Sequence, residues 1–229
     1  MAEGTMASMP GMPMPGPPAG TLAYFTAASL MWLLMMTAMM LPSASPMILL
    51  YARVTGRMRA DGASLAPTFV FAGVYLALWS LFAMAAGGLQ AALVHWGVLH
   101  AGLLSLRAQA AAGILLLLAG AYQFTSAKQA CLDRCRAPLS LLVNWWRPGW
   151  AGAARLGLVH GLYCIGCCWA LMALLFVGGV MNLGWVVALA VLVAVEKLAP
   201  FSRAATLASG IVATATGVGL LILALIARP

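Results

Sequence analysis

The sequence predicts an all-α, polytopic membrane bundle of about six transmembrane helices, with the N-terminus and the C-terminus both outside. Of the 229 residues, 64% are hydrophobic and only 7% are charged, and the mean hydropathy is +1.01. Soluble domains carry about 25% charged residues. The apolar residues form long runs, and most of the basic residues lie between these runs. This pattern predicts burial in lipid, because a charged side chain is costly in hydrocarbon.

The lengths of the apolar runs set the expected number of helices, since a helix that crosses a bilayer needs about 20 residues. The run 156–195 contains no Lys, Arg, Asp or Glu. At about 1.5 Å per residue it would extend about 60 Å, twice the thickness of a hydrocarbon core. We therefore expect two helices here, with a tight break at residues 178–182, and we expect Gly87-Gly88 to end the second helix. The predicted helices cover residues 22–41, 66–86, 108–127, two segments of 156–195, and 204–227.

The basic residues predict the orientation, because cytoplasmic loops of membrane proteins are enriched in Lys and Arg. With the N-terminus outside, ten of the 12 basic residues fall in inner loops and only Arg107 and Arg228 fall outside. A cleaved signal peptide is the competing interpretation of the first run, but no basic segment precedes it. The predicted inner residues are Arg53, Arg57, Arg59, Lys128, Arg134, Arg136, Arg147, Arg155, Lys197 and Arg203.

Two segments are expected to lie outside the spans. Residues 1–20 alternate Met, Pro and Gly and are expected to form a disordered extracytoplasmic tail, followed by the transmembrane domain at 21–229. Met6, Met9 and Met12 recur every three residues and could present thioethers to Cu(I), or could be chance features of a low-complexity tail. The segment 128–155 combines tryptophans with arginine and is expected to lie along the inner surface as a re-entry segment.

The composition also excludes several functions. Four acidic residues provide almost no material for paired-carboxylate catalysis or for an oxygen-rich metal site. The sequence contains no phosphate-binding loop, so we expect no bound nucleotide. The basic residues form no patch with interleaved aromatics, so nucleic-acid binding is not expected. Haem is not expected either, because no two histidines are predicted at one depth on facing helices.

The chemistry of the chain is expected at a His-x-x-x-Cys-x-x-Cys-Cys motif. His160, Cys164, Cys167 and Cys168 project from a helix within one stripe roughly 100° wide. His160 and Cys168 would lie about 12 Å apart along the axis, so one ion could not use both, whereas neighbours three or four residues apart could share one. We expect this motif near the inner end of the fourth helix.

Cys131 and Cys135 are predicted to face the same leaflet as this motif, one helical turn apart. Thiols on the cytoplasmic side of a membrane are expected to be reduced. Thiols with an imidazole are suitable ligands for copper as Cu(I), or alternatively for zinc. The competing interpretation is structural, because buried cysteine also packs as a small hydrophobic residue.

Four further residues are predicted as accessory ligands of this site. Met39 and Met40 belong to methionine rows on the first helix, where thioethers can bind a soft metal or simply fill space. Glu196 adjoins Lys197 at the inner end of the fifth helix, as an interfacial ion pair or as a carboxylate that binds metal or relays a proton. Met181 follows the expected break in the hairpin.

Several segments together resemble a bacterial family known as predicted metal-binding integral membrane protein, domain of unknown function 2182. The similarity covers residues from about 30 to about 200, and the most specific parts are Cys135-Arg136 and the CxxCCW segment. The resemblance implies a multi-pass protein of the bacterial inner membrane with a metal site and no established activity. The tail and the last helix lie outside it. The segments are Trp32, Ala38-Met39-Met40-Leu41-Pro42, Ala119 to Gln123, Lys128, Cys131 to Pro138, Gly161 to Met172, Met181-Asn182 and Glu196-Lys197.

Three functions are compatible with these observations. The first is a non-enzymatic membrane protein that handles a soft metal at the cytoplasmic side and exchanges it with a donor or acceptor protein. The second is an assembly or partner subunit of a larger membrane complex, in which the thiols only pack. The third is a thiol redox protein that uses Cys131 and Cys135 with the CxxCC segment.

Overall fold

The computed structural model describes residues 18, 20–57, 66–99 and 109–226, and these are all-helical, with no strand among them. The expected all-α class is thus confirmed for the described part of the chain. Met6, Met9 and Met12 of the predicted tail lie outside the described residues, as do Arg59, Arg107 and Arg228. The helices are α1 (Leu22–Arg57), α2 (Ala66–His95), α3 (Gln109–Gln123), α4 (Ser126–Arg136), α5 (Pro138–Trp145), α6 (Gly149–Ala173), α7 (Leu175–Gly178), α8 (Leu183–Leu198) and α9 (Ser202–Ile226).

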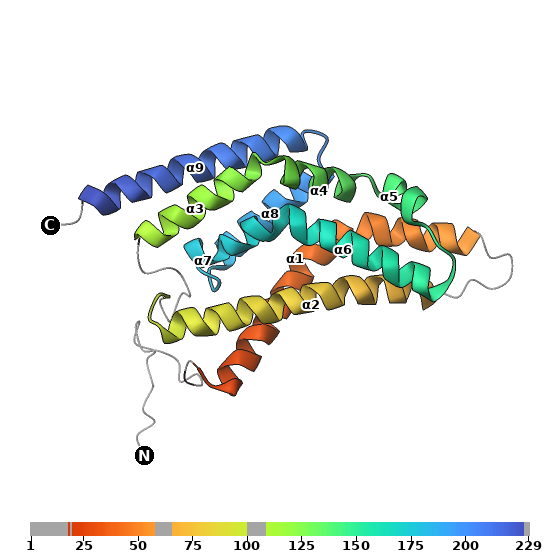
Figure 1. Cartoon of the computed structure of the whole chain (residues 1–229), viewed down its shortest axis with the longest axis horizontal. Coiled ribbons are helices and arrows are strands. Elements are labelled where there is room, and N and C mark those ends of the chain that lie inside the picture. The colour runs from red at the N-terminus through yellow and green to blue at the C-terminus, as the bar shows by residue number, and fades with distance from the viewer. Residues whose placement is uncertain (1–17, 19, 58–65, 100–108, 227–229) are drawn as a thin grey trace, which may run out of the picture.

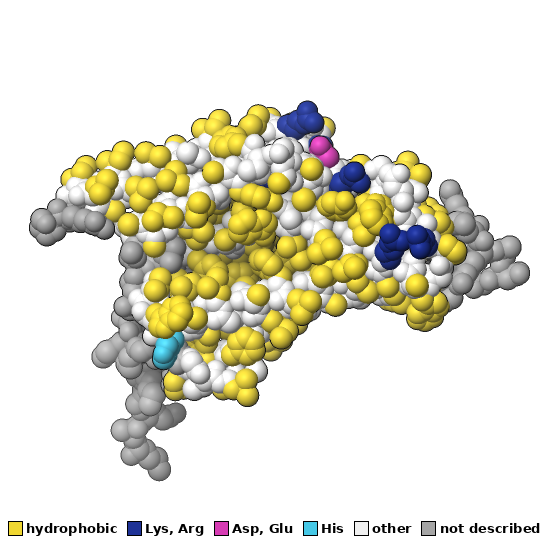
Figure 2. All heavy atoms as spheres, in the orientation of Figure 1, with side chains coloured by type: hydrophobic (Ala, Val, Ile, Leu, Met, Phe, Trp, Pro, Cys, Tyr) yellow, Lys and Arg dark blue, Asp and Glu magenta, His cyan; other side chains and the backbone are white. Residues whose placement is uncertain are grey.

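The helices run back and forth between two ends of the molecule (Figure 1). One end of the bundle lies toward the left of the view and contains the start of α1, the end of α2, the start of α3, the α7–α8 turn and the end of α9. The connections after α5 and α8 lie farther to the right. On the face drawn in Figure 2, the Lys and Arg side chains gather in the right-hand half. This separation agrees with the predicted clustering of basic residues at one end, while the orientation in a bilayer stays a prediction.

Four helical segments are long and apolar enough to cross a membrane: Leu22–Gly56, Ala66–His95, Gly149–Gly178 and Ser202–Ile226. A fifth span is possible if α3 and α4, which are bent by 63° at their junction, count as one. The remaining predicted span, the fifth along the chain, would be α8, which has 16 residues. Its length of about 24 Å is shorter than a hydrocarbon core of about 30 Å. The count of six therefore stays a prediction.

The first two helices are longer than the sequence pattern indicated. The first was expected to end at Leu41, but α1 continues through Pro42 and Pro46 to Arg57. Pro46 has no N–H for the carbonyl of Pro42, and the Ser45 hydroxyl donates to that carbonyl instead, at 2.8 Å. Serine side chains can satisfy backbone groups that a proline leaves free in a membrane helix. The two prolines therefore do not end α1.

Gly87-Gly88 was expected to end the second helix, and this expectation was wrong. The α2 helix passes through both glycines to His95. A Cβ atom built at Gly87 would lie 2.9 Å from the backbone nitrogen of Ser29 on α1. Gly87 thus allows two helix backbones to approach closely, which is a common use of small residues between membrane helices.

The predicted break at residues 178–182, between the two arms of the expected helical hairpin, is confirmed. The first arm ends at Gly178, and Gly179 has a φ of 94°, a left-handed conformation that glycine adopts readily. The second arm begins at Leu183, where the Asn182 side chain accepts a hydrogen bond from the Trp185 N–H at 3.2 Å. Asparagine is a preferred N-cap residue because it satisfies one of the free N–H groups of the first turn.

The predicted re-entry segment, residues 128–155, is mostly helical. It contains most of α4, the short helix α5 and the first turns of α6, which begins at Gly149 and not at Leu156. Lys128 and Leu132 of α4 are buried. The α4 helix also packs on α6, so this part of the segment belongs to the bundle. This packing brings α4 to the motif on α6.

Candidate metal centre

The four motif residues on α6 all face the interior of the bundle. His160 is 4% exposed, and Cys164, Cys167 and Cys168 are each 1% exposed. The α6 helix packs against α2 and α4, and more lightly against α8. Periodicity predicted that the four side chains share one side of a helix, and their common burial agrees with this prediction.

A sulfur cluster forms where α6 meets α4 and α1. We define it as Met40, Cys135, Cys164, Cys167 and Cys168. The Cys167 Sγ lies 3.9 Å from the Cys135 Sγ, and the Cys168 Sγ lies 4.0 Å from the Met40 Sδ. The Lys197 Nζ lies 3.0 Å from the Cys164 Sγ and 3.7 Å from the Met40 Sδ, which places Cys164 at the same cluster. All five cysteines of the chain are free, so these are thiol contacts and not disulfides.

The cluster lies deeper than the sequence indicated. The motif was expected near the inner end of its helix because the helix was expected to begin at Leu156. The observed span Gly149–Gly178 has 30 residues, and Cys164 lies at its middle, about 22 Å from the start of α6. The thiols therefore lie at mid-depth of this helix, about 13 Å from the exposed Arg155.

Local hydrogen bonds orient the thiols. The Cys167 and Cys168 thiols donate to the carbonyl oxygen of Cys164, at 3.1 and 3.0 Å, as side chains three and four residues along a helix can do. The Tyr75 hydroxyl of α2 lies 3.2 Å from the Cys164 Sγ and 3.3 Å from the carbonyl oxygen of Met40. Tyr75 thus contacts both α1 and α6 at the cluster.

His160 lies beside the cluster with both ring nitrogens unpaired. Its ring stacks on Tyr75, with centroids 5.5 Å apart, and on Phe71, with centroids 5.9 Å apart. Among the described residues, neither the Nδ1 nor the Nε2 atom has a hydrogen-bond partner. A buried polar group without a partner costs about 1–3 kcal/mol. An imidazole held in this way has a free nitrogen lone pair, which is what a metal ligand requires.

Lys197 of α8 brings a positive charge to the cluster. Its Nζ lies 3.0 Å from the Cys164 Sγ, 3.7 Å from the Met40 Sδ and 3.3 Å from the Ser43 Oγ. The side chain is buried, with 6% of the residue exposed. Within the described residues, Lys197 forms no ion pair with a carboxylate. A buried charge requires compensation, and the thiol groups are the nearest atoms that can carry negative charge.

Glu196 is engaged in a separate polar network. Its carboxylate forms a buried ion pair with Lys128 of α4, with the Nζ and Oε2 atoms 2.6 Å apart. Gln123 and Ser209 also donate to its Oε1, each at 3.1 Å. The expected pairing of Glu196 with its neighbour Lys197 is therefore replaced by a pairing across helices. Among the described residues, no hydrogen bond or ion pair joins this carboxylate to a thiol.

The structure places the remaining predicted ligands away from the cluster contacts. Cys131 points toward α6 at Gly166, where a built Cβ would lie 2.8 Å from the Cys131 Sγ. Met39 is 8% exposed and packs in the core. Met181 is 57% exposed in the α7–α8 turn. In the described part of the chain, no three His, Cys, Asp or Glu side chains are arranged so that they could hold a metal ion as they stand.

Two residues of this environment were not predicted from the sequence. Tyr75 is one aromatic residue within a long apolar run, and nothing in its local pattern marks it. Lys197 was visible as a basic residue next to Glu196, but its position suggested the end of a helix at the membrane surface. The local sequence carries no signal for this position, because Glu196, the carboxylate next to Lys197, pairs with Lys128 only in the folded bundle.

These features define an all-helical bundle of apolar helices with a buried, sulfur-rich candidate site. The chain belongs to the PpoB2 copper chaperone family, whose family model matches residues 29–220. No curated protein and no solved structure matches the chain significantly. The match supports a metal-related family and a copper-related role, although the family name differs from domain of unknown function 2182. It also extends into α9, which was expected to lie outside the resemblance.

Proposed function

We propose that this protein is a membrane-embedded copper chaperone that holds Cu(I) at the sulfur cluster and passes it to another protein. The spacing of the sulfur atoms carries this proposal. Two thiolates bound to one ion at about 2.3 Å in a tetrahedral site lie about 3.8 Å apart. The contacts between Cys167 and Cys135 and between Cys168 and Met40, at 3.9 and 4.0 Å, are close to that spacing. Small rotations of these side chains would bring two or three sulfurs onto one ion.

The ligand set favours copper over harder ions. Thiolate and thioether ligands select Cu(I), and His160 adds a buried nitrogen with no other partner. The Glu196 carboxylate is paired with Lys128, so it does not supply an oxygen ligand to the site. Zinc remains the alternative cargo for a thiolate and imidazole set, but the Met40 thioether is a ligand that favours Cu(I).

The buried lysine supports the same proposal through charge. Cu(I) held by two thiolates carries one net negative charge. The Lys197 ammonium, 3.0 Å from the Cys164 Sγ, would make this assembly neutral. A neutral assembly reduces the cost of keeping charge in a low-dielectric interior. Metal binding requires deprotonated thiols, so loading would release their protons.

The location and the partner are part of the proposal. We place the chain in a bacterial inner membrane as a six-span protein with both termini outside, supported by its apolar helices and by the distribution of basic residues. The copper would arrive from or leave to a donor or acceptor protein, or a larger membrane complex. Exchange between soft ligand sets suits a chaperone, because it moves the ion without releasing it.

Met40→Leu tests this function, because leucine keeps the apolar volume of methionine and removes the thioether. We expect Cu(I) binding about tenfold weaker than in the wild type, as measured by competition with a colorimetric Cu(I) chelator under anaerobic conditions. Met39→Leu is the matched control, since Met39 packs in the same core, whereas Met40 is the methionine that contacts the Cys168 thiol. It should bind copper like the wild type. A wild-type protein that fails to compete with the chelator would refute the proposed function.

A further inference from the structure

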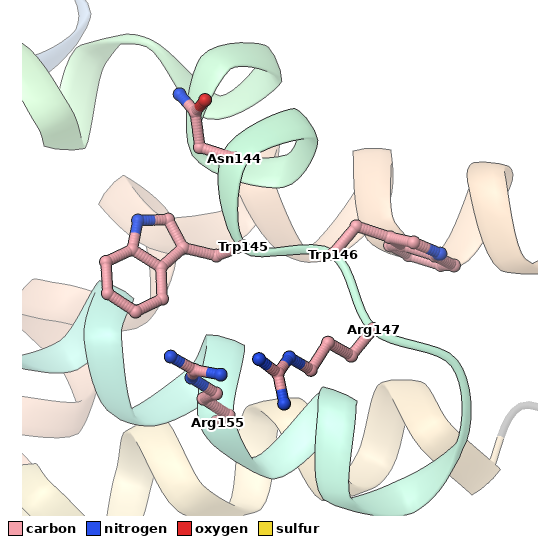
Figure 3. Close-up of a pocket in the computed structure, with 5 residues that line it drawn as sticks. All are labelled: Asn144, Trp145, Trp146, Arg147 and Arg155. Atoms are coloured by element: carbon pink, nitrogen blue, oxygen red, sulfur yellow. The ribbon is translucent and has the colours of Figure 1, made fainter.

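A second site lies at the connection between α5 and α6, apart from the sulfur cluster. Asn144, Trp145, Trp146, Arg147 and Arg155 line a cavity of about 220 Å³ that opens to the surface. In Figure 3 the guanidinium groups of Arg147 and Arg155 point toward each other across this space. Within the described residues, neither arginine forms an ion pair with a carboxylate. Two positive groups that face each other without a counter-charge repel, and a bound anion would remove that repulsion.

Packing fixes Arg155 and the connection that carries Arg147. The Arg155 guanidinium lies over the Trp145 ring, 4.9 Å from its centroid, and Trp146 packs on Tyr51 of α1, with centroids 5.5 Å apart. A Cβ atom at Gly152 would overlap the carbonyl oxygen of Arg147, so this glycine lets the connection fold closely onto α6. Contacts among α1, α5 and α6 therefore form the walls of the pocket.

The two arginines supply the phosphate-binding groups of this pocket. Arginine can form paired hydrogen bonds to phosphate oxygens, and two arginines in one cavity offer two such pairs. The first turn of α6, which begins at Gly149, does not line the cavity, so Arg147 and Arg155 carry its positive charge.

Apolar side chains next to the pocket indicate which phosphate compound binds. Leu139 and Val143 of α5 and Trp150 of α6 are 62, 72 and 61% exposed. Such a rim would be unfavourable in water but is suited to contact with acyl chains. Basic pockets beside transmembrane helices on the inner side of a membrane bind the head groups of anionic lipids. We propose that Arg147 and Arg155 bind the phosphate of an anionic phospholipid whose acyl chains contact α5 and the start of α6.

The test uses the full chain in a neutral detergent and measures its thermal unfolding midpoint with three additives. Short-chain phosphatidylglycerol should raise the midpoint saturably. Phosphatidylcholine of the same chain length, and inorganic phosphate at the same concentration, should not. The double variant Arg147→Gln/Arg155→Gln should need at least about tenfold more phosphatidylglycerol for half of the effect, because charge-assisted hydrogen bonds to phosphate are lost.

Arg53→Gln/Arg203→Gln is the matched control, because it removes the same charge from two exposed arginines that do not line the pocket. It should respond like the wild type. The single variant Arg147→Gln, which disturbs no recorded packing contact, gives the readout if the pocket double variant does not fold. An equal response to phosphatidylcholine, an equal response to inorganic phosphate, or an equal loss in both double variants would overturn the proposal. The unfolding readout needs no copper, so it is independent of the proposed function.

Discussion

Cys164→Ser and Cys167→Ser should each lose nearly all bound copper while still inserting and folding. Serine removes a thiolate, keeps the side-chain volume nearly constant, and can donate to the carbonyl one turn earlier, as the thiol of Cys167 does at 3.1 Å. We expect Cu(I) affinity to fall at least about 100-fold, more than on loss of the neutral Met40 thioether, since loss of a charged thiolate ligand should exceed the 10- to 100-fold cost of losing a supporting contact. Copper per chain after anaerobic purification is the measurement.

Cys131→Ser is the control for these two variants, because Cys131 lies on α4 like Cys135 but contacts α6 at Gly166, outside the sulfur cluster. It should retain most of the copper. If the thiols only pack, as in an assembly subunit, all three variants and the wild type would contain the same small amount of metal. Equal copper in Cys131→Ser and Cys164→Ser would therefore contradict the assignment of the cluster.

Lys197→Met should weaken copper binding without weakening the fold. Opposite charges about 4 Å apart attract by about 4 kcal/mol at an effective dielectric constant of 20. Loss of the ammonium 3.0 Å from the Cys164 Sγ should therefore reduce Cu(I) affinity at least about 100-fold. The copper-free protein should be as stable as the wild type or more stable, because methionine is not a buried cation that needs compensation. Chelator competition and thermal unfolding of the copper-free protein give the two measurements.

Two variants separate this charge effect from general disruption. Lys197→Arg keeps the positive charge and should retain more copper than Lys197→Met. Lys128→Met removes the other buried lysine and leaves Glu196 without its ion-pair partner. Breaking a buried pair in this way costs about 3–5 kcal/mol of stability. A Lys197→Met protein that lost stability as Lys128→Met does, and kept its copper affinity, would assign Lys197 a purely structural role.

Local sequence patterns predicted much of the fold but not where its helices end. Long apolar runs indicated the helical class, and Gly179 and Asn182 marked the hairpin. The helix ends predicted at Pro42 and Gly87 were wrong for two reasons. The Ser45 hydroxyl donates a hydrogen bond to the Pro42 carbonyl, so the helix continues past the prolines. Gly87 allows α1 and α2 to pack closely and does not end its helix. Both effects depend on neighbours in space or on side-chain hydrogen bonds, which a hydropathy pattern does not contain.

The candidate site was likewise predictable from the sequence only in part. The stripe from His160 to Cys168 follows from helical periodicity alone. The contacts of Cys135 with Cys167 and of Lys197 with Cys164 join residues of different helices, and only tertiary packing brings them together. The depth of the thiols was misjudged because the start of α6 was placed at Leu156, when the Trp- and Arg-rich segment before it is already helical from Gly149.

The central claim is that sulfur atoms of this cluster bind Cu(I), and X-ray absorption spectroscopy of the copper-loaded wild-type protein tests it most directly. The protein would be loaded and measured without oxygen, so that the thiols remain reduced. We predict the absorption edge of Cu(I) and a first coordination shell made mainly of sulfur. A first shell made only of oxygen and nitrogen, or a protein that retains no copper after loading, would contradict the account.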